Sequence, residues 1–309
     1  ITEGLVGSEM CIRDRDTTGT FETAITLQKH KMLTAIHKFY SIKDWEKNVE
    51  KLDPNFISVT VGQSKEDLQL GQKIFSLNSD IKYLCIDVAN GYREDFINSV
   101  KNYRETFPDK IIIAGNVATR EMTEALILAG ADIVKIGIGP GSVCTTRSVA
   151  GVGYPQLSSI SECSDAAHGL GGHVMADGGC KYPGDVSKAF GAGADYVMLG
   201  GMFAGHKESG GELVTDEEGV QYKDFYGMSS TKAQQTYYGD LAEHRAPEGK
   251  KVRLRYKGEL DKTVQSILGG MRSACSYVGA KKLKDLPKST TFIRVTQTTN
   301  EIFTGSENI

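Results

Sequence analysis

The chain has 309 residues and a formal net charge of −3, with 39% hydrophobic and 24% charged residues. These values are typical of a globular protein with one large α/β barrel or two smaller domains. The lack of a basic field argues against nucleic acid as a partner. No apolar run reaches the roughly 18 residues of a membrane-spanning helix, so the sequence predicts no transmembrane helix and no membrane partner.

Residues 1–15 read ITEGLVGSEMCIRDR and fit neither helical nor strand periodicity. They also lack the apolar core of a signal peptide. After Asp16 the patterns become regular, beginning with a helical stretch over Phe21–Lys31. Residues 1–15 therefore differ in kind from the rest of the chain.

Strand-like runs then alternate with amphipathic helical stretches, which indicates a parallel sheet. The expected strands are Leu33–His37, Phe56–Val61, Tyr83–Val88, Ile111–Val117, Ile133–Ile138, His173–Asp177 and Tyr196–Leu199. One helix is predicted over Thr119–Ala129, with Thr119 as its N-cap. A closed (β/α)8 barrel needs eight strands. We therefore predict an α/β TIM barrel whose first strand is missing, with an open seam and unpaired backbone groups.

The alternation of strands and helices ends after the last predicted strand. Residues 205–257 are polar and glycine-punctuated, and a loop this long inside a compact protein is usually functional. We interpret it as a mobile flap over the barrel mouth. Leu260–Leu283 returns to a helical pattern, and the tail from Thr291 to Ile309 is predicted to be partly extended and to lie on the surface or at a subunit contact.

The stretch Ile133–Arg147, IVKIGIGPGSVCTTR, joins a buried strand to a glycine-rich turn that carries Cys144. Gly137, Gly139 and Gly141 permit torsions and close approaches that a Cβ would block. A thiol held on such a turn, followed by two threonines, indicates a nucleophile next to a ligand. A buried structural cysteine is the alternative. A dinucleotide fingerprint is disfavoured, because its glycine spacing and distant acidic residue are not both present.

The six cysteines show neither CxxC nor zinc-site spacing. Reduced thiols and a cytoplasmic location are the corresponding expectation.

The carboxyl ends of the predicted strands carry Asp87–Gly91, Gly115-Asn116, Asp177-Gly178-Gly179 and Gly200-Gly201. Exposed backbone N–H groups at glycine pairs suit a phosphate, and the Asp177 carboxylate can accept hydrogen bonds from the vicinal hydroxyls of a ribose. Each feature alone could be a turn or a helix cap. Together on one face they predict a nucleoside monophosphate site.

The motif GPGSVCTTR, followed by GVGYPQL at Gly151–Leu157, resembles the cysteine loop of the IMP dehydrogenase and GMP reductase family. The resemblance begins abruptly at Asp16 and extends to the C-terminus. Family members have a longer N-terminal region that ends in the first barrel strand. The expected domains are therefore a non-native leader over residues 1–15 and a single barrel domain over residues 16–309.

The resemblance implies that Cys144 attacks C2 of GMP, that ammonia leaves, and that NADPH then gives hydride to the covalent purine adduct to yield IMP. Such a reaction belongs to purine salvage. Thr146 and Glu248 match the pair that supplies the proton to the leaving nitrogen. Without the resemblance, Thr146 reads as a turn hydroxyl and Glu248 as a solvated charge on the flap. The family also implies a homotetramer.

The ligand-binding residues follow from the same resemblance. The substrate positions are Ser142, Asp177, Gly178, Gly179, Gly200, Gly201, Tyr226, Gly227, Met228, Ser229, Arg245, Ala246, Pro247, Glu248 and Gly249. The NADPH positions are Lys38, Asp87, Val88, Ala89, Ile138, Gly139, Met228, His244, Arg245, Ser273, Ala274, Cys275 and Ser276. The positions for a monovalent cation, potassium, are Gly139, Gly141, Cys144 and Arg147.

Two features favour the reductase branch over the dehydrogenase branch. Lys38 to Asn55 leaves no room for the regulatory domain that dehydrogenases usually insert. Dehydrogenases also need an Arg-Tyr pair in the flap, whereas Arg245 is followed by Ala246 here, and Arg255-Tyr256 falls in a segment that matches a structural strand. The alternatives are an IMP dehydrogenase without the insert and a catalytically inactive nucleotide-binding barrel.

Overall fold

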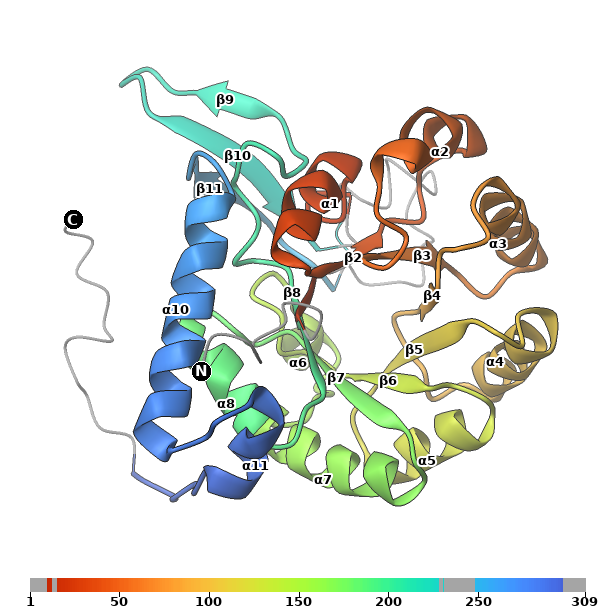
Figure 1. Cartoon of the computed structure of the whole chain (residues 1–309). Helices are drawn as coiled ribbons and strands as arrows, with labels where there is room; N and C mark the ends of the chain where they lie inside the picture. The colour runs from red at the N-terminus through yellow and green to blue at the C-terminus, as the bar shows by residue number, and fades with distance from the viewer. Residues whose placement is uncertain (1–9, 13–15, 228–229, 231–247, 297–309) are drawn as a thin grey trace.

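The computed structural model describes residues 10–12, 16–227, 230 and 248–296. Parallel strands form a closed barrel in chain order, β1 to β8, each pairing with the next and the last with the first (Figure 1). They are β1 (Met10–Ile12), β2 (Leu33–Ile36), β3 (Ile57–Val61), β4 (Tyr83–Asp87), β5 (Ile111–Val117), β6 (Ile133–Ile136), β7 (His173–Asp177) and β8 (Tyr196–Leu199). The predicted TIM-barrel fold is confirmed.

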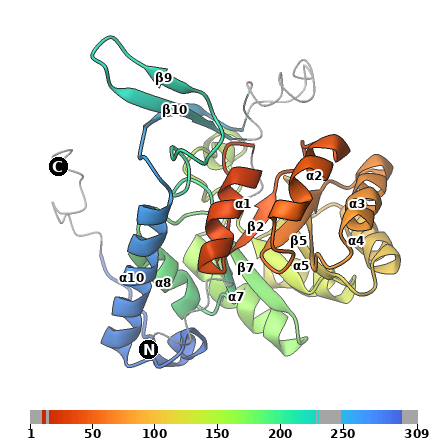
Figure 2. The ribbon, with the colours of Figure 1, turned by 45° about the horizontal axis from the view of Figure 1, so that its top comes forward.

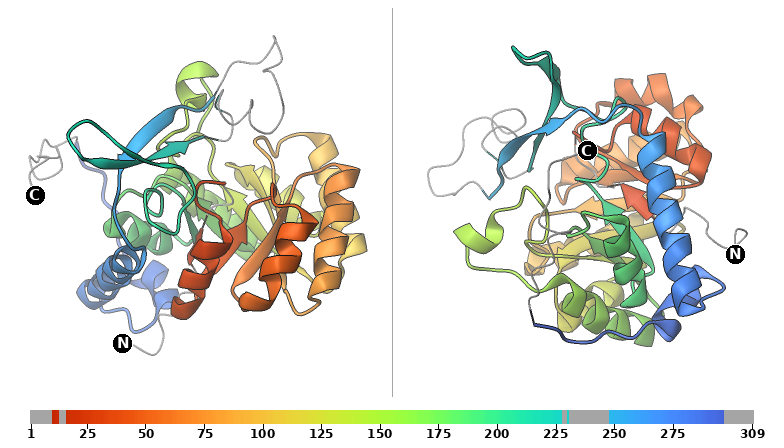
Figure 3. Two further views of the ribbon diagram at one scale, coloured as in Figure 1. Left: turned by 90° about the horizontal axis from the view of Figure 1, so that it is seen from above. Right: turned by 90° about the vertical axis from the view of Figure 1, so that its left-hand side faces the viewer.

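Helices surround the strands, as the views from above and from the side show (Figure 3). They are α1 (Phe21–Leu27), α2 (Ile42–Asn48), α3 (Lys65–Leu77), α4 (Glu94–Thr106), α5 (Arg120–Leu128), α6 (Thr146–Val149), α7 (Gln156–Gly169), α8 (Pro183–Gly191), α10 (Asp261–Val278) and α11 (Leu286–Ser289), with 3-10 helices η2 (Gln28–His30), η3 (Val49–Lys51) and η4 (Leu283–Asp285). None of the helices in the described part combines the length and the apolar composition that crossing a bilayer requires.

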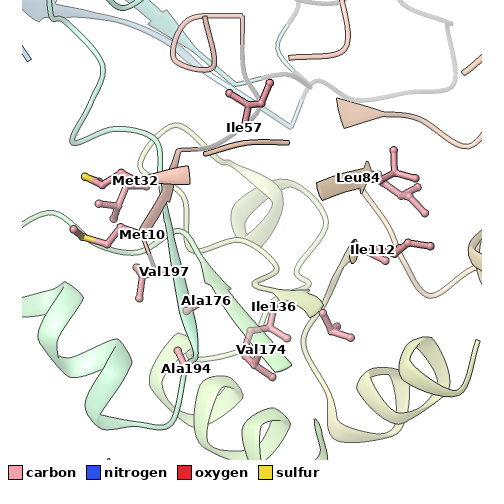
Figure 4. Packing of buried hydrophobic residues seen from close by; sticks show 14 of the residues in the cluster. Met10, Met32, Ile57, Leu84, Ile112, Ile136, Val174, Ala176, Ala194 and Val197 are labelled. Carbon is pink, nitrogen blue, oxygen red and sulfur yellow. The ribbon is translucent and has the colours of Figure 1, made fainter. Parts of the chain in front are cut away.

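The expected open seam is wrong. The three residues of β1 pair in parallel with both β2 and β8, in the register Cys11 with Leu33 and Met198. Met10 is buried and lies beside Met32 and Val197 (Figure 4). The physical reason is that a sheet edge leaves a row of unpaired backbone groups, and even a short segment that satisfies them stabilises the barrel. The strand falls within residues 1–15; that these residues are a non-native leader stays a prediction.

Local signals set the helix boundaries. Ser41 and Ser64 form capping boxes with Asp44 and Asp67, in which the serine hydroxyl accepts from the third backbone N–H and the aspartate accepts from the serine N–H. Thr119 is the N-cap residue of α5 as predicted, but its side chain makes no capping hydrogen bond.

The apolar residues pack in two layers. An outer layer fills the space between strands and helices, and an inner layer fills the barrel. The inner layer is formed by Leu33, Ala35, Cys85, Ile113, Ile133, Met175 and Met198. This packed interior leaves the strand ends as the place for a site.

The predicted flap is more ordered than a polar loop. It contains an antiparallel sheet, in the order β11-β10-β9, built from β9 (Leu213–Thr215), β10 (Gln221–Tyr226) and β11 (Lys251–Arg255). The hairpin of β9 and β10 projects from the barrel (Figure 2). Val143, Ala204 and Phe225 form a small buried cluster that joins this sheet to the cysteine loop. The sheet therefore has a fixed attachment beside the predicted nucleophile.

The C-terminal helical pattern is one helix, α10, followed by short turns. Gly269 and Gly270 lie inside it, and a Cβ on Gly270 would lie 2.6 Å from Cβ of Pro183, so this glycine lets α10 approach the start of α8. Gly279 ends the helix with φ +72°. Residues 291–296 are exposed and have no regular structure, in line with the predicted surface tail.

His37, after β2, makes stability depend on pH. Burial lowers the pKa of its imidazole from 6.5 to about 4, against the opposing charges of Asp16 and Asp44. Between pH 6.5 and about 4 the imidazole is protonated in the unfolded chain but neutral in the folded chain. The free energy of unfolding therefore falls as pH falls from 6.5 toward 4. We expect a loss of about 3 kcal/mol. His37→Phe can keep the stacking on Tyr40. In this variant the free energy of unfolding, measured with urea, should depend much less on pH across this range, and an unchanged pH dependence would contradict the role given to His37.

Candidate functional site

The carboxyl ends of β7 and β8 and the cysteine loop enclose a pocket. It is lined by Gly141, Ser142, Asp177, Gly178, Gly179, Cys180, Met198, Leu199, Gly200, Gly201 and Phe225. Seven of the residues predicted as strand-end or loop ligands are in this lining, including both glycine pairs. The structure thus brings the predicted phosphate-binding and ribose-binding positions to one hollow.

Backbone torsions explain the first glycine pair. Gly178 and Gly179 have φ +90° and +91°, a region that side-chain-bearing residues rarely adopt. A Cβ on Gly178 would also lie 3.2 Å from Cγ of Pro140. The turn after β7 can therefore pack closely against the cysteine loop beside the pocket.

Asp177 ends β7 and is fully buried. Its Oδ2 accepts a hydrogen bond of 2.8 Å from Nδ2 of Asn116, which also donates to the Gly137 carbonyl at 3.0 Å. Oδ1 of Asn116 is buried and has no hydrogen-bond partner among the described residues. A buried acceptor without a donor is costly, so it fits a site where a ligand hydroxyl completes the set.

The cysteine loop is held by the end of the flap. Cys144 and Gly249 form an antiparallel bridge. Thr145 N–H donates to the Glu248 carbonyl at 3.0 Å, and Lys250 N–H donates to the Val143 carbonyl at 2.9 Å. Two backbone hydrogen bonds therefore fix the position of Glu248 relative to the thiol, although the two residues are far apart in the sequence.

A chain of hydrogen bonds links the three predicted catalytic side chains. Sγ of Cys144 lies 3.2 Å from Oγ1 of Thr146, which donates to Oε2 of Glu248 at 2.6 Å. All three side chains are partly exposed, and Gly141 and Ser142, next to Cys144 in the loop, line the pocket. The arrangement places a thiol, an alcohol and a carboxylate within reach of one bound molecule, as nucleophilic and acid–base chemistry requires.

Tyr226, a predicted phosphate ligand at the end of β10, is buried, and its hydroxyl donates to Oδ2 of Asp16. Gly227 packs against Gly249, with 3.1 Å between its ideal Cβ position and Cα of Gly249. The remaining predicted substrate and cofactor residues of the flap, Met228, Ser229, His244, Arg245, Ala246 and Pro247, lie outside the described residues.

The predicted cofactor residues fall into two groups. One group, Lys38, Asp87–Ala89 and Ile138-Gly139, lies at or just after the ends of β2, β4 and β6 at the barrel mouth, where Nζ of Lys38 donates to the Asp87 carbonyl at 3.3 Å. Ser273–Ser276 lie instead on α10, across the barrel from β4 (Figure 1). Cys275 is buried there. A single chain does not bring the two groups together.

The predicted cation residues share one loop. Gly139 has φ +83°, and a Cβ there would lie 2.6 Å from Cγ of Arg147, whose guanidinium donates to the Tyr154 carbonyl at 2.6 Å. Cys144 N–H donates to the Gly141 carbonyl at 3.0 Å. The predicted need for glycine at positions 137 and 139 is confirmed by their positive φ values.

Sequence reasoning placed Asn116 at the strand ends without a partner, and it left Asp16 and Lys135 out of the site. Asn116 holds Asp177, Asp16 holds Tyr226, and Lys135 pairs with the carboxylate of Asp87. A lysine in the middle of the buried run IVKIG was the available signal for the third.

The fold and the site define an α/β-barrel enzyme with a glycine-lined pocket at the carboxyl ends of its strands, beside a linked thiol, alcohol and carboxylate. The family model for the IMP dehydrogenase / GMP reductase domain matches residues 6–302, and the chain belongs to this family of oxidoreductases. It is 54% identical over 304 residues to "GMP reductase" of Caenorhabditis elegans, and the aligned region covers 97% of this chain and 85% of the relative. It is 55% identical to "GMP reductase 2" of Mus musculus, over 97% and 87% of the two chains. A bacterial relative, "GMP reductase" of Buchnera aphidicola, is 55% identical over 96% and 86%.

Proposed function

We propose that the chain catalyses the NADPH-dependent reductive deamination of GMP to IMP and ammonia. The hydrogen-bonded chain from Cys144 through Thr146 to Glu248 beside the glycine-lined pocket carries the proposal. The names of the relatives support it. So does the position of Arg255, which pairs with Tyr222 in the flap sheet, so that Arg255-Tyr256 is tied into a structural strand. The dehydrogenase's water-activating pair then has no counterpart in this segment.

The residues act in the following roles. Ser142, Gly179, Gly201 and Tyr226 receive the phosphate, and Asp177 accepts from the ribose. The Cys144 thiolate adds to C2 of the purine, and the bond from C2 to the amino nitrogen breaks as that nitrogen takes a proton through Thr146 and Glu248. The products of this half are ammonia and a purine joined to Cys144 by a C–S bond. When Cys144 leaves C2 after reduction, IMP is released and the thiolate is restored.

The polar side chains at the barrel mouth suit a nicotinamide cofactor. Lys38 supplies a cation, and Asp87 supplies a carboxylate that is 19% exposed. When bound, NADPH supplies the hydride. Potassium belongs to the same proposal, since carbonyl oxygens on the loop from Gly139 to Arg147 are the ligands such an ion prefers.

The direction of nicotinamide absorbance change tests the proposal. Purified chain with GMP and NADPH should consume NADPH and release one ammonia per NADPH. Reduction of NAD by IMP, with no consumption of NADPH by GMP, would instead identify an IMP dehydrogenase. Binding of GMP without either reaction would identify an inactive nucleotide-binding barrel.

A further inference from the structure

Three residues on adjacent strands form one row across the barrel mouth. Asp87 on β4 pairs in register with Gly115 on β5, which pairs with Lys135 on β6. The side chain of Lys135 is fully buried, whereas that of Asp87 is 19% exposed. The Lys135 ammonium and the Asp87 carboxylate form an ion pair. A buried lysine is rare unless it is paired, so this row needs an explanation.

Gly115 makes the pairing possible. A Cβ at this position would lie 2.6 Å from Cβ of Lys135 and 2.5 Å from its carbonyl oxygen. With no side chain between them, Lys135 reaches across β5 to the carboxylate two strands away. The row thus combines a fully buried cation, a position without a side chain, and a partly exposed anion at the carboxyl end of β4.

Asp87 is held from two sides. Lys135 contacts its carboxylate, and Nζ of Lys38 donates to its main-chain carbonyl at 3.3 Å. Removing one partner of a buried pair leaves an uncompensated charge, which is far more costly than removing both. The orientation of the Asp87 carboxylate therefore depends on Lys135.

We infer that Lys135 is a positioning residue for the cofactor: it acts through Asp87 and sets affinity for the reduced nicotinamide dinucleotide without touching the substrate. The inference rests on the proposed function. The nucleotide pocket is formed from the cysteine loop and the ends of β7 and β8, so its lining does not include Lys135 or Asp87. The inference therefore predicts that substituting Lys135 lowers the affinity for the cofactor and leaves the affinity for GMP unchanged.

The test compares Lys135→Met, Lys135→Arg, Asp87→Asn and the double variant Lys135→Met/Asp87→Asn. NADPH affinity is measured by its fluorescence, GMP affinity by calorimetry, and turnover by NADPH absorbance. Lys135→Met should weaken NADPH binding by about tenfold or more, in line with loss of a buried charge contact, and leave GMP affinity within about twofold. Lys135→Arg should keep much of the NADPH affinity that Lys135→Met loses. On the Asp87→Asn background, Lys135→Met should add little, because the two act as one unit.

Equal losses of GMP and NADPH affinity, or additive effects in the two single variants, would show that Lys135 only supports the fold and would overturn the inference. If Lys135→Met does not fold, the double variant, which leaves no unpaired charge, decides. Its NADPH affinity should then equal that of Asp87→Asn, and a further loss would overturn the inference. Failure of the proposed function looks different, because the unchanged chain would then neither bind NADPH nor consume it with GMP.

Discussion

Cys144→Ala is expected to abolish NADPH consumption with GMP, with kcat lowered by about 10⁴-fold or more, the range seen when a covalent nucleophile is removed. GMP affinity should change little. In the proposed mode of binding, Asp177 and the glycine pairs hold the nucleotide, and alanine leaves their hydrogen bonds and the bridge between residues 144 and 249 in place. The variant therefore separates binding from chemistry.

Two measurements make this result specific. GMP affinity by calorimetry should stay within a few-fold of the unchanged chain. A GMP analogue with a leaving group at C2 should become joined to Cys144 only where the thiol is present, and should add its mass less that of the leaving group and the thiol proton. Cys163→Ala is the matched control, because Cys163 is a buried thiol on α7 outside the site. It should keep turnover. If Cys144→Ala turned over GMP like the unchanged chain, a covalent mechanism would be untenable.

Most of the barrel could be predicted because its strands are buried on both faces. Apolar runs such as Ile111–Val117 and His173–Asp177 then read as strands with the bounds that the structure has. β1 could not be predicted. Its three residues carry no periodicity, and their place is decided by the backbone groups that β2 and β8 leave unpaired. Closure of a barrel selects a segment by hydrogen bonding more than by side-chain pattern.

The residues of the site likewise fall into those that the sequence could predict and those that it could not. The cysteine loop and the glycine pairs are local motifs, so their residues were visible in the sequence and converge on one pocket. Partnerships between strands were not visible, because they depend on register. Lys135 reaches Asp87 only through the gap at Gly115, and Asn116 reaches Asp177 across β6. Without register, a lysine in a strand has no identifiable partner.

Glu248→Gln is expected to slow release of ammonia by about 10²–10⁴-fold, the usual contribution of a positioned acid or base. An amide can still accept from Oγ1 of Thr146, and the main-chain bond from Thr145 N–H to the Glu248 carbonyl does not involve the side chain. The geometry should therefore survive while the group that exchanges a proton is lost. Thr146→Val should cause a similar loss, and the double variant little more, because both residues serve one proton path.

The partial reaction in the opposite direction isolates this role. In this direction the Cys144 thiolate adds to C2 of IMP, NADP takes up the hydride that C2 loses, and the purine stays joined to Cys144, with no amine to protonate. Single-turnover reduction of NADP by IMP should therefore lose much less in Glu248→Gln than ammonia release from GMP does. Glu259→Gln is the matched control, since Glu259 is 68% exposed and pairs only loosely with Lys207 at 3.8 Å; both rates should be unchanged. Equal losses in the two half-reactions of Glu248→Gln would mean that the carboxylate orders the cysteine loop and does not carry the proton.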